Sequence, residues 1–150
     1  MLAMLWPIIL AGIIVVLLAQ TVIVKDSLTH NANNGDAGAM QFIAGSRAVT
    51  AFAENNPGYT GNITAQQIAP YISPYTLPAG FAAQIGSAQL TMWSASLPAS
   101  VPADVWRLTG NDCAYAVNPS GTLQSPCGSL GAAPTGVATG SLVYTISAPQ

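Results

Sequence analysis

The sequence predicts an α+β protein in which a single N-terminal transmembrane helix is followed by a small head domain. Three observations lead to this class. The first 24 residues carry no charged side chain, the next part of the chain shows helical periodicity, and β-type patterning takes over from residue 81 onward. We expect a membrane anchor over residues 1–28 and a head over residues 29–150, with helices first and a small antiparallel sheet after them.

The apolar N-terminal run is long enough to cross a bilayer, because about 20 apolar residues span a hydrocarbon core of ~30 Å. The expected span is Leu2–Val24, and Lys25 is the first charged residue. The run lacks the basic start and the small-x-small cleavage site of a secretory signal peptide, so we expect it to be retained. Trp6 is expected at the membrane interface, Pro7 in the first turns, and Gly12 at a close helix contact. The alternative is that Trp6 and Gly12 simply face lipid.

The head is expected to begin with a helix over Ala37–Glu54. Asp36 is placed to act as its N-cap, and the NNPG sequence over 55–58 is expected to end it. Four positions recur at the spacing of one helix face, at about 100° per residue. These positions are Phe42, Gly45, Val49 and Phe52.

A second, shorter helix is expected over Thr64–Ile72. Thr64 and Gln67 stand at the spacing of a capping box, and Pro74 and Pro78 follow as helix breakers. This spacing predicts a helix that begins at Thr64.

The remaining elements are expected to be strands. Their β-type patterning covers Gln89–Ala95, Asp112–Val117 and Leu142–Ser147, and the last of these alternates most regularly. Gly128–Gly140 is rich in Gly, Ala, Pro and Thr and is expected to be a loop.

The composition excludes several classes of function. Three Lys or Arg and five Asp or Glu among 150 residues give a net charge of −2, too little positive charge for nucleic-acid binding. His30 is the single histidine, and with two cysteines it makes no four-ligand metal set. Asp104 and Arg107 are expected to form a local ion pair beside a buried Trp106. We therefore expect no enzyme activity, no cofactor and no metal site. The low charge also favours packing into an assembly, including a homo-oligomer.

Cys113 and Cys127 are the two cysteines of the chain. Their even number and short spacing in a small polar domain predict a disulfide, which would contribute roughly 3 kcal/mol through chain entropy. Disulfides persist in oxidising compartments. We therefore expect a periplasmic head, although Lys25 alone would mildly favour the cytoplasm. The alternative is two free structural thiols.

Two segments resemble the PilM family. Residues 37–61 read AGAMQFIAGSRAVTAFAENNPGYTG, similar to a helix followed by the family's N-P-G-[YF]-T-G stretch, and Ile68–Gly80, which ends in LPAG, is similar too. PilM proteins are thin-pilus proteins of type IVb pilus operons on conjugative plasmids and in enterobacteria. The resemblance implies an inner-membrane accessory protein that acts in pilin handling or in the pilus basal body, without catalytic residues. The C-terminal region with Cys113 and Cys127 is expected to depart from the family pattern.

The resemblance predicts non-catalytic binding and scaffolding in type IVb pilus assembly, with pilins or other assembly proteins as partners. The alternative is a type IV pilin or minor pilin of the extracellular filament, whose anchor, head and late cysteine pair follow the same plan. Leu5 stands where pilins usually carry Glu, and no leader is visible before Met1. A third class is an unrelated lipid-anchored or envelope binding domain.

Four aromatic residues in a proline-rich stretch form a candidate partner surface. They would dock another pilus component, or else pack in the core and in turns around the prolines. They are Tyr59, Tyr71, Tyr75 and Phe81.

Overall fold

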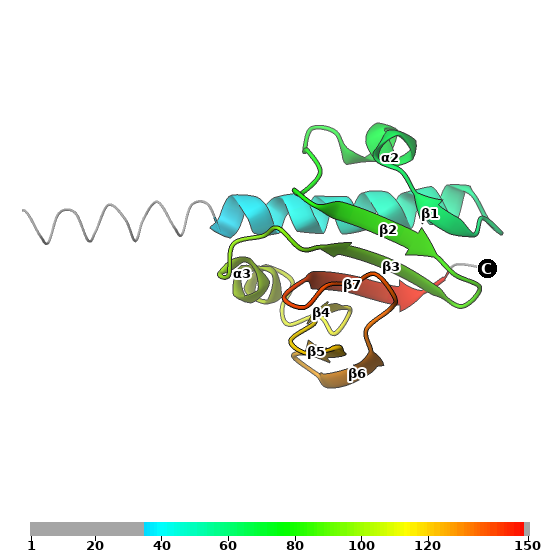
Figure 1. Ribbon diagram of the computed structural model, residues 1–150. Helices are drawn as coiled ribbons and strands as arrows, with labels where there is room; N and C mark the ends of the chain where they lie inside the picture. The colour runs from blue at the N-terminus through cyan, green and yellow to red at the C-terminus, as the bar shows by residue number, and fades with distance from the viewer. Residues whose placement is uncertain (1–34, 149–150) are drawn as a thin grey trace, which may run out of the picture. The chain divides into compact units, whose positions relative to one another are not determined.

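A long helix and an antiparallel sheet organise residues 35–148, the part of the chain that the computed structural model describes (Figure 1). The long helix covers residues 35–55, and the seven strands follow the spatial order β1-β2-β3-β7-β4-β5-β6. The other elements are, in chain order, β1 (Gly61–Ile63), α2 (Ala65–Ile72), β2 (Phe81–Ile85), β3 (Gln89–Ser94), α3 (Val101–Leu108), β4 (Tyr115–Val117), β5 (Thr122–Ser125), β6 (Gly128–Ala132) and β7 (Leu142–Ser147).

The predicted membrane anchor over residues 1–28, with Trp6, Pro7 and Gly12, lies outside the described residues. Within residues 35–148, no helix combines the length and the apolarity that a membrane crossing requires.

The long helix buries the face that the sequence predicts. Phe42 and Val49 are fully buried and Phe52 is nearly so. Gly45 allows close approach to the sheet, because a Cβ at this position would lie only 3.1 Å from the Met92 methyl carbon. The prediction for Asp36 is wrong: residues 35 and 36 are both helical, so Asp36 lies within the helix and its carboxylate binds Arg107.

Helix α2 is capped as predicted. The Thr64 hydroxyl accepts a hydrogen bond from the Gln67 backbone N–H at 3.3 Å, and the Gln67 side chain accepts one from the Thr64 backbone N–H at 2.8 Å. The capping box therefore fixes the start of a helix that buries Ile68 and Ile72 against the core.

The strand predictions are confirmed for β7 and nearly so for β3, while β4 covers only the last three residues of the expected segment. Two expectations are wrong. β6 lies inside the predicted loop Gly128–Gly140, and helices do not all precede the sheet, because α3 follows β3 and β1 precedes α2. Helix α3 is only eight residues long and buries only Val101 and Val105, so its periodicity is too short to be recognised.

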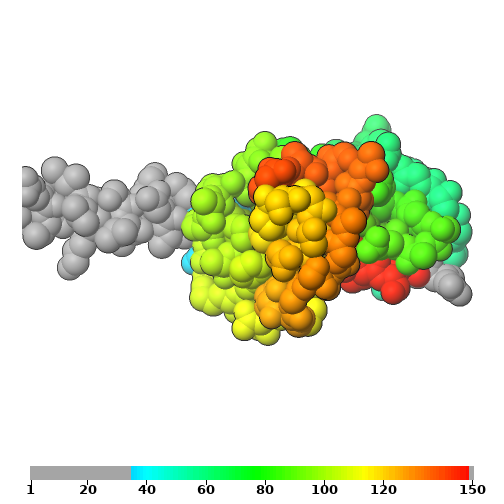
Figure 2. Space-filling model, turned by 60° about the horizontal axis from the view of Figure 1, so that its bottom comes forward, coloured from blue at the N-terminus to red at the C-terminus, as the bar shows by residue number. Residues whose placement is uncertain are grey.

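The sheet has apolar residues buried on both faces. Its larger core lies under the long helix and includes Leu90, Met92 and Leu142. A smaller cluster of Ala116, Leu123 and Val143 lies apart from it, packed against half-buried residues that include Trp93. Figure 2 shows β4, β5 and β6 with the segment before β7, in yellow to orange, gathered on one side of the head.

Candidate functional site

The aromatic residues that the sequence offers as a partner surface have different surroundings. Phe52 of the long helix receives Tyr59 and Tyr71 edge-on, with ring centroids 5.2 and 6.4 Å away. The Tyr59 hydroxyl also donates to the Asn62 carbonyl at 2.7 Å. Tyr59 is therefore held by packing and a hydrogen bond, and it ties the chain before β1 to the long helix.

Tyr71 and Tyr75 are the exposed members of the set. They are 37% and 44% exposed, so a large part of each side chain faces solvent. Phe81 is half-buried in β2 and packs against the larger core. The structure thus leaves Tyr71 and Tyr75 available for contact and places Tyr59 and Phe81 mainly in packing roles, while a partner role for any of the four stays a prediction.

A pocket of about 400 Å³ lies between the long helix and the segment that connects α3 to β4. Two of its apolar side chains, Met40 and Leu108, are each 41% exposed, while one cation and one anion complete its rim. Its lining residues come from segments more than 60 positions apart in the sequence, which is why sequence patterns do not reveal it. The lining residues are Met40, Ile43, Arg47, Leu108, Thr109, Asp112 and Tyr115.

Hydroxyl groups beneath this pocket join the long helix to the sheet. Tyr115 and Ser46 share a hydrogen bond of 2.9 Å, and Tyr144 and Thr50 share one of 3.2 Å. Tyr115 and Tyr144 are partners across β4 and β7, with ring centroids 5.1 Å apart. Burial raises the pKa of both tyrosines above the usual value near 10. Both phenols therefore stay neutral near pH 7, which suits a structural role.

A second pocket of about 320 Å³ lies beside the edge strand β1. Its uncharged lining combines Trp93 and Phe81 with the polar side chains of Asn62 and Thr64. The Thr64 hydroxyl already serves the cap of α2, so this pocket offers few free polar groups.

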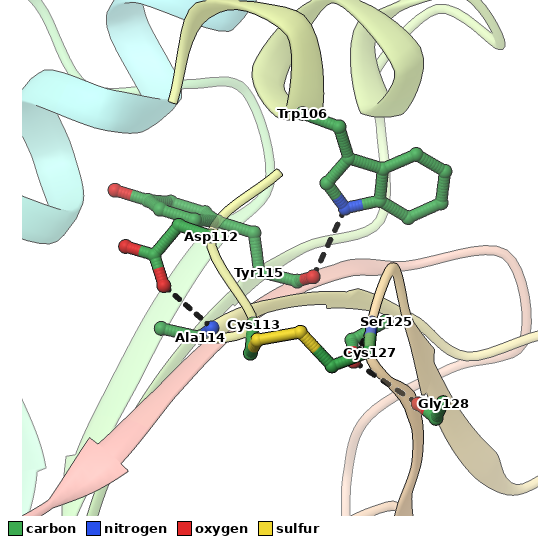
Figure 3. The surroundings of a disulfide bond; sticks show 8 residues. All are labelled: Trp106, Asp112, Cys113, Ala114, Tyr115, Ser125, Cys127 and Gly128. Carbon is green, nitrogen blue, oxygen red and sulfur yellow. Dashed lines mark hydrogen bonds between the residues drawn. A yellow bond between two sulfur atoms is a disulfide. The ribbon is translucent and has the colours of Figure 1, made fainter. Parts of the chain in front are cut away.

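The predicted disulfide between Cys113 and Cys127 is present (Figure 3), with Cα atoms 5.5 Å apart. It connects the segment before β4 to the β5–β6 turn. The Ser125 hydroxyl accepts from the Cys127 backbone N–H at 3.2 Å and donates to the Gly128 carbonyl at 3.0 Å. Sequence analysis did not identify this supporting role of Ser125, whose only signal is a serine in a turn between two short strands.

Neighbouring contacts hold the other side of the disulfide. The Asp112 carboxylate accepts from the Ala114 backbone N–H at 2.9 Å. The Trp106 indole N–H donates to the Tyr115 carbonyl at 3.0 Å and thereby docks α3 on β4. Trp106 is half-buried rather than fully buried as expected.

Charged groups in the described region form a small network and no metal site. Arg107 binds Asp36 and, at 3.3 Å, Asp104, so the predicted local ion pair is confirmed and gains a second acid. Within residues 35–148, no group of three or more metal-ligating side chains comes together. His30 lies outside these residues.

Comparison with known proteins gives one family and one fold. The model of the PilM family matches residues 8–145, a range that extends over the C-terminal region that was expected to depart from the family pattern. The crystal structure of a PilM protein from Escherichia coli B7A is similar with a TM-score of 0.57 and 16% identity, over 77% of this chain and 94% of that chain. A search of curated proteins gave no match.

Proposed function

The chain belongs to the PilM family, and from that premise we propose that it is an inner-membrane-anchored accessory component of type IVb pilus assembly that acts by binding and scaffolding. Membership of the family suggests a pilus-related role. We further propose that the chain is anchored in the inner membrane, that its head is periplasmic, that the system is type IVb, and that the protein has no catalytic activity.

One observation carries the proposal: the family match begins at residue 8 and ends at residue 145. It therefore includes most of the uncharged run before Lys25 as well as nearly all of the folded head. An apolar segment and a head that belong to one family unit favour a protein in which the segment anchors and the head binds. The disulfide supports a head on the oxidising side of the membrane.

The head offers contact surface rather than chemistry. Tyr71 and Tyr75 present amphipathic rings to solvent, the kind of side chain that interfaces favour. Met40 and Leu108 add exposed apolar surface at the larger pocket. These surfaces suit capture of a pilin or another assembly protein.

A second candidate function is a pilin-like subunit of the filament. It is favoured by the combination of a long helix packed along an antiparallel sheet with a disulfide late in the chain. In this alternative the apolar segment would leave the bilayer and pack inside the filament.

Fractionation of piliated cells separates the two candidates. We expect the full chain to sediment with the inner membrane after pili are sheared off, with its N-terminus at Met1. A protease added to spheroplasts should then digest the head. Co-purification with washed filaments, or an N-terminus created by removal of a leader, would favour the pilin-like alternative. A cytoplasmic protein and a filament-tip adhesin serve as fractionation controls.

The partner surface is tested by the variant Tyr71→Ala/Tyr75→Ala in the full chain. We expect cross-linking to pilins and other pilus assembly proteins to fall several-fold. The melting temperature should fall less than in the control below, because Tyr75 is 44% exposed and Tyr71, whose ring meets Phe52 edge-on at 6.4 Å, is still 37% exposed. The matched control is Tyr59→Ala, which should lower the melting temperature because it removes the Phe52 contact and the bond to Asn62. Unchanged cross-linking in the double variant would remove these tyrosines from the interface.

A further inference from the structure

The outward face of the long helix is largely uncovered by the described residues, although Ala44 touches the larger core and Met40 and Arg47 border the larger pocket. Its side chains are exposed or half-exposed and recur every three or four positions, which places them along one side of the helix. Met40, at 41% exposure, is its largest apolar member. We call this the outer face, formed by Ala37, Met40, Ala44, Arg47, Ala51 and Glu54.

The outer face carries two charges that have no ion-pair partner among residues 35–148. Arg107 forms ion pairs with both Asp36 and Asp104. The Asp112 carboxylate accepts a hydrogen bond from the Ala114 backbone N–H. Arg47 and Glu54, in contrast, make no salt bridge or side-chain hydrogen bond to another residue of 35–148. Arg47 and Glu54 are seven positions apart, which separates them by about 10 Å along the helix axis. That spacing is too long for the ion pairs that form three or four positions apart.

We propose that a second copy of this chain docks on the outer face, with the two long helices antiparallel and a two-fold axis passing between residues 50 and 51. Arg47 of each copy then meets Glu54 of the other, so the pairing makes two reciprocal ion pairs. The small side chain of Ala51 lies beside the axis and permits the helices to approach to about 8–10 Å. The interface is isologous and closes at two copies.

Charge complementarity selects this occupant. The face carries one cation and one anion at a separation that matches itself after a two-fold rotation, whereas an in-register parallel pair would set Arg47 against Arg47 and Glu54 against Glu54. An anionic lipid surface would be attracted by Arg47 but repelled by Glu54. A second copy satisfies both charges at once. This inference goes beyond the proposed function.

Single cysteines placed on the outer face test the geometry in the full chain, purified in detergent. Ala51→Cys lies next to the two-fold axis and should give a disulfide-linked dimer under mild oxidation. Ala37→Cys lies on the same face but about 40 Å from its mate in this arrangement, and it should give none. Peptide mapping should locate the link at residue 51, with Cys113–Cys127 intact. Equal linking of both variants would overturn the proposal.

Charge reversal then tests the pairing itself in the Ala51→Cys background. Arg47→Glu alone and Glu54→Arg alone should each reduce the dimer several-fold, because each sets like charges together. Combining the two changes should restore it. Gln124→Glu, an exposed change on β5, is the matched control and should leave the dimer unchanged.

Failure of the combined variant to restore linking would overturn the proposal. A cross-linked ladder from Ala44→Cys/Ala51→Cys would also overturn it, because that pattern requires parallel helices staggered by one heptad. Both results leave the fractionation experiment unaffected, so the two hypotheses can fail separately.

Discussion

The side of the sheet under the long helix is stabilised differently from the β4–β6 ribbon, which carries the disulfide and which we call the disulfide side. Under the helix, a broad apolar core surrounds fully buried Phe42, Val49 and Leu90. On the disulfide side, the buried cluster is only Ala116, Leu123 and Val143. There a covalent bond and a buried polar side chain supplement a small apolar area. The comparison teaches that one domain can combine core packing with the cross-links that small domains need.

Asn118 is the polar counterpart of the core on the disulfide side. It is only 2% exposed. Its amide N–H₂ donates to the carbonyls of Val137 and Ala138, and its amide oxygen accepts from the Gly121 N–H. One side chain therefore fixes both the β4–β5 turn and the segment before β7.

The largest effect is expected from Phe42→Ala, which breaks the core under the helix. The side chain is fully buried, so its removal should lower the free energy of unfolding by about 3–5 kcal/mol. Urea titration of the full chain measures this loss. Met40→Ala, on the exposed side of the same helix, should cost less than about 1 kcal/mol. Similar losses for the two variants would contradict the assignment of the core face.

Removing the disulfide should produce the second-largest loss of stability. Cys113→Ser/Cys127→Ser opens a loop with a sequence separation of 14, and the expected loss is about 3 kcal/mol. Hydrogen exchange should accelerate first in β4, β5 and β6, while amides of the long helix stay protected. If the helix amides lose protection first, the two sides are coupled more tightly than the comparison implies.

Asn118→Ala should have a smaller and more local effect of about 1–3 kcal/mol, because it leaves buried backbone groups without partners. We expect faster exchange at Gly121, whose N–H donates to the Asn118 side-chain oxygen. Gly140 should change less, because its N–H donates to the Asn118 backbone carbonyl, which the variant keeps. Asn118→Asp keeps the acceptor and should retain protection at Gly121. Uniform loss of protection throughout the head would argue against a local role.

Alkaline pH should produce the smallest loss of stability, and this loss should arise on the helix side. The pKa values of Tyr115 and Tyr144 are raised in the folded state by burial. The unfolded chain therefore loses these protons first, at about pH 10. The contribution of these two tyrosines to the free energy of unfolding is constant below that pH. The free energy of unfolding should fall as pH rises above it. Tyr115→Phe should make this fall shallower and cost about 1 kcal/mol through its lost bond to Ser46. An unchanged alkaline slope in this variant would contradict the assignment.

Local signals account for what the sequence predicts well. The alternation of Leu142–Ser147 and the capping box at Thr64 depend on residues next to one another, and both appear as predicted. β6 has only exposed residues, so no pattern of burial distinguishes it from a loop. Its pairing with β5 and the nearby disulfide determine its conformation.

The candidate site also has parts that the sequence predicts and parts that it does not. The pairing of Cys113 with Cys127 follows from their number and spacing, and the structure contains it. The larger pocket joins Met40 and Arg47 to Leu108 and Asp112, and only tertiary packing brings those segments together. The charge relation between Arg47 and Glu54 is visible in the sequence, but it acquires meaning only once the outer face is known to be exposed.

The position of β7 has a consequence for how the chain matures during synthesis. β7 pairs with β3 on one side and β4 on the other, so β1–β3 and β4–β6 are two separate three-stranded ribbons until Leu142–Ser147 is available. Both cysteines precede β7 in the chain. Oxidation can therefore complete the second ribbon before the sheet closes. The sheet can close only after nearly the whole head has been synthesised. Pairing of β7 with β3 and β4 is therefore the last step in forming the sheet.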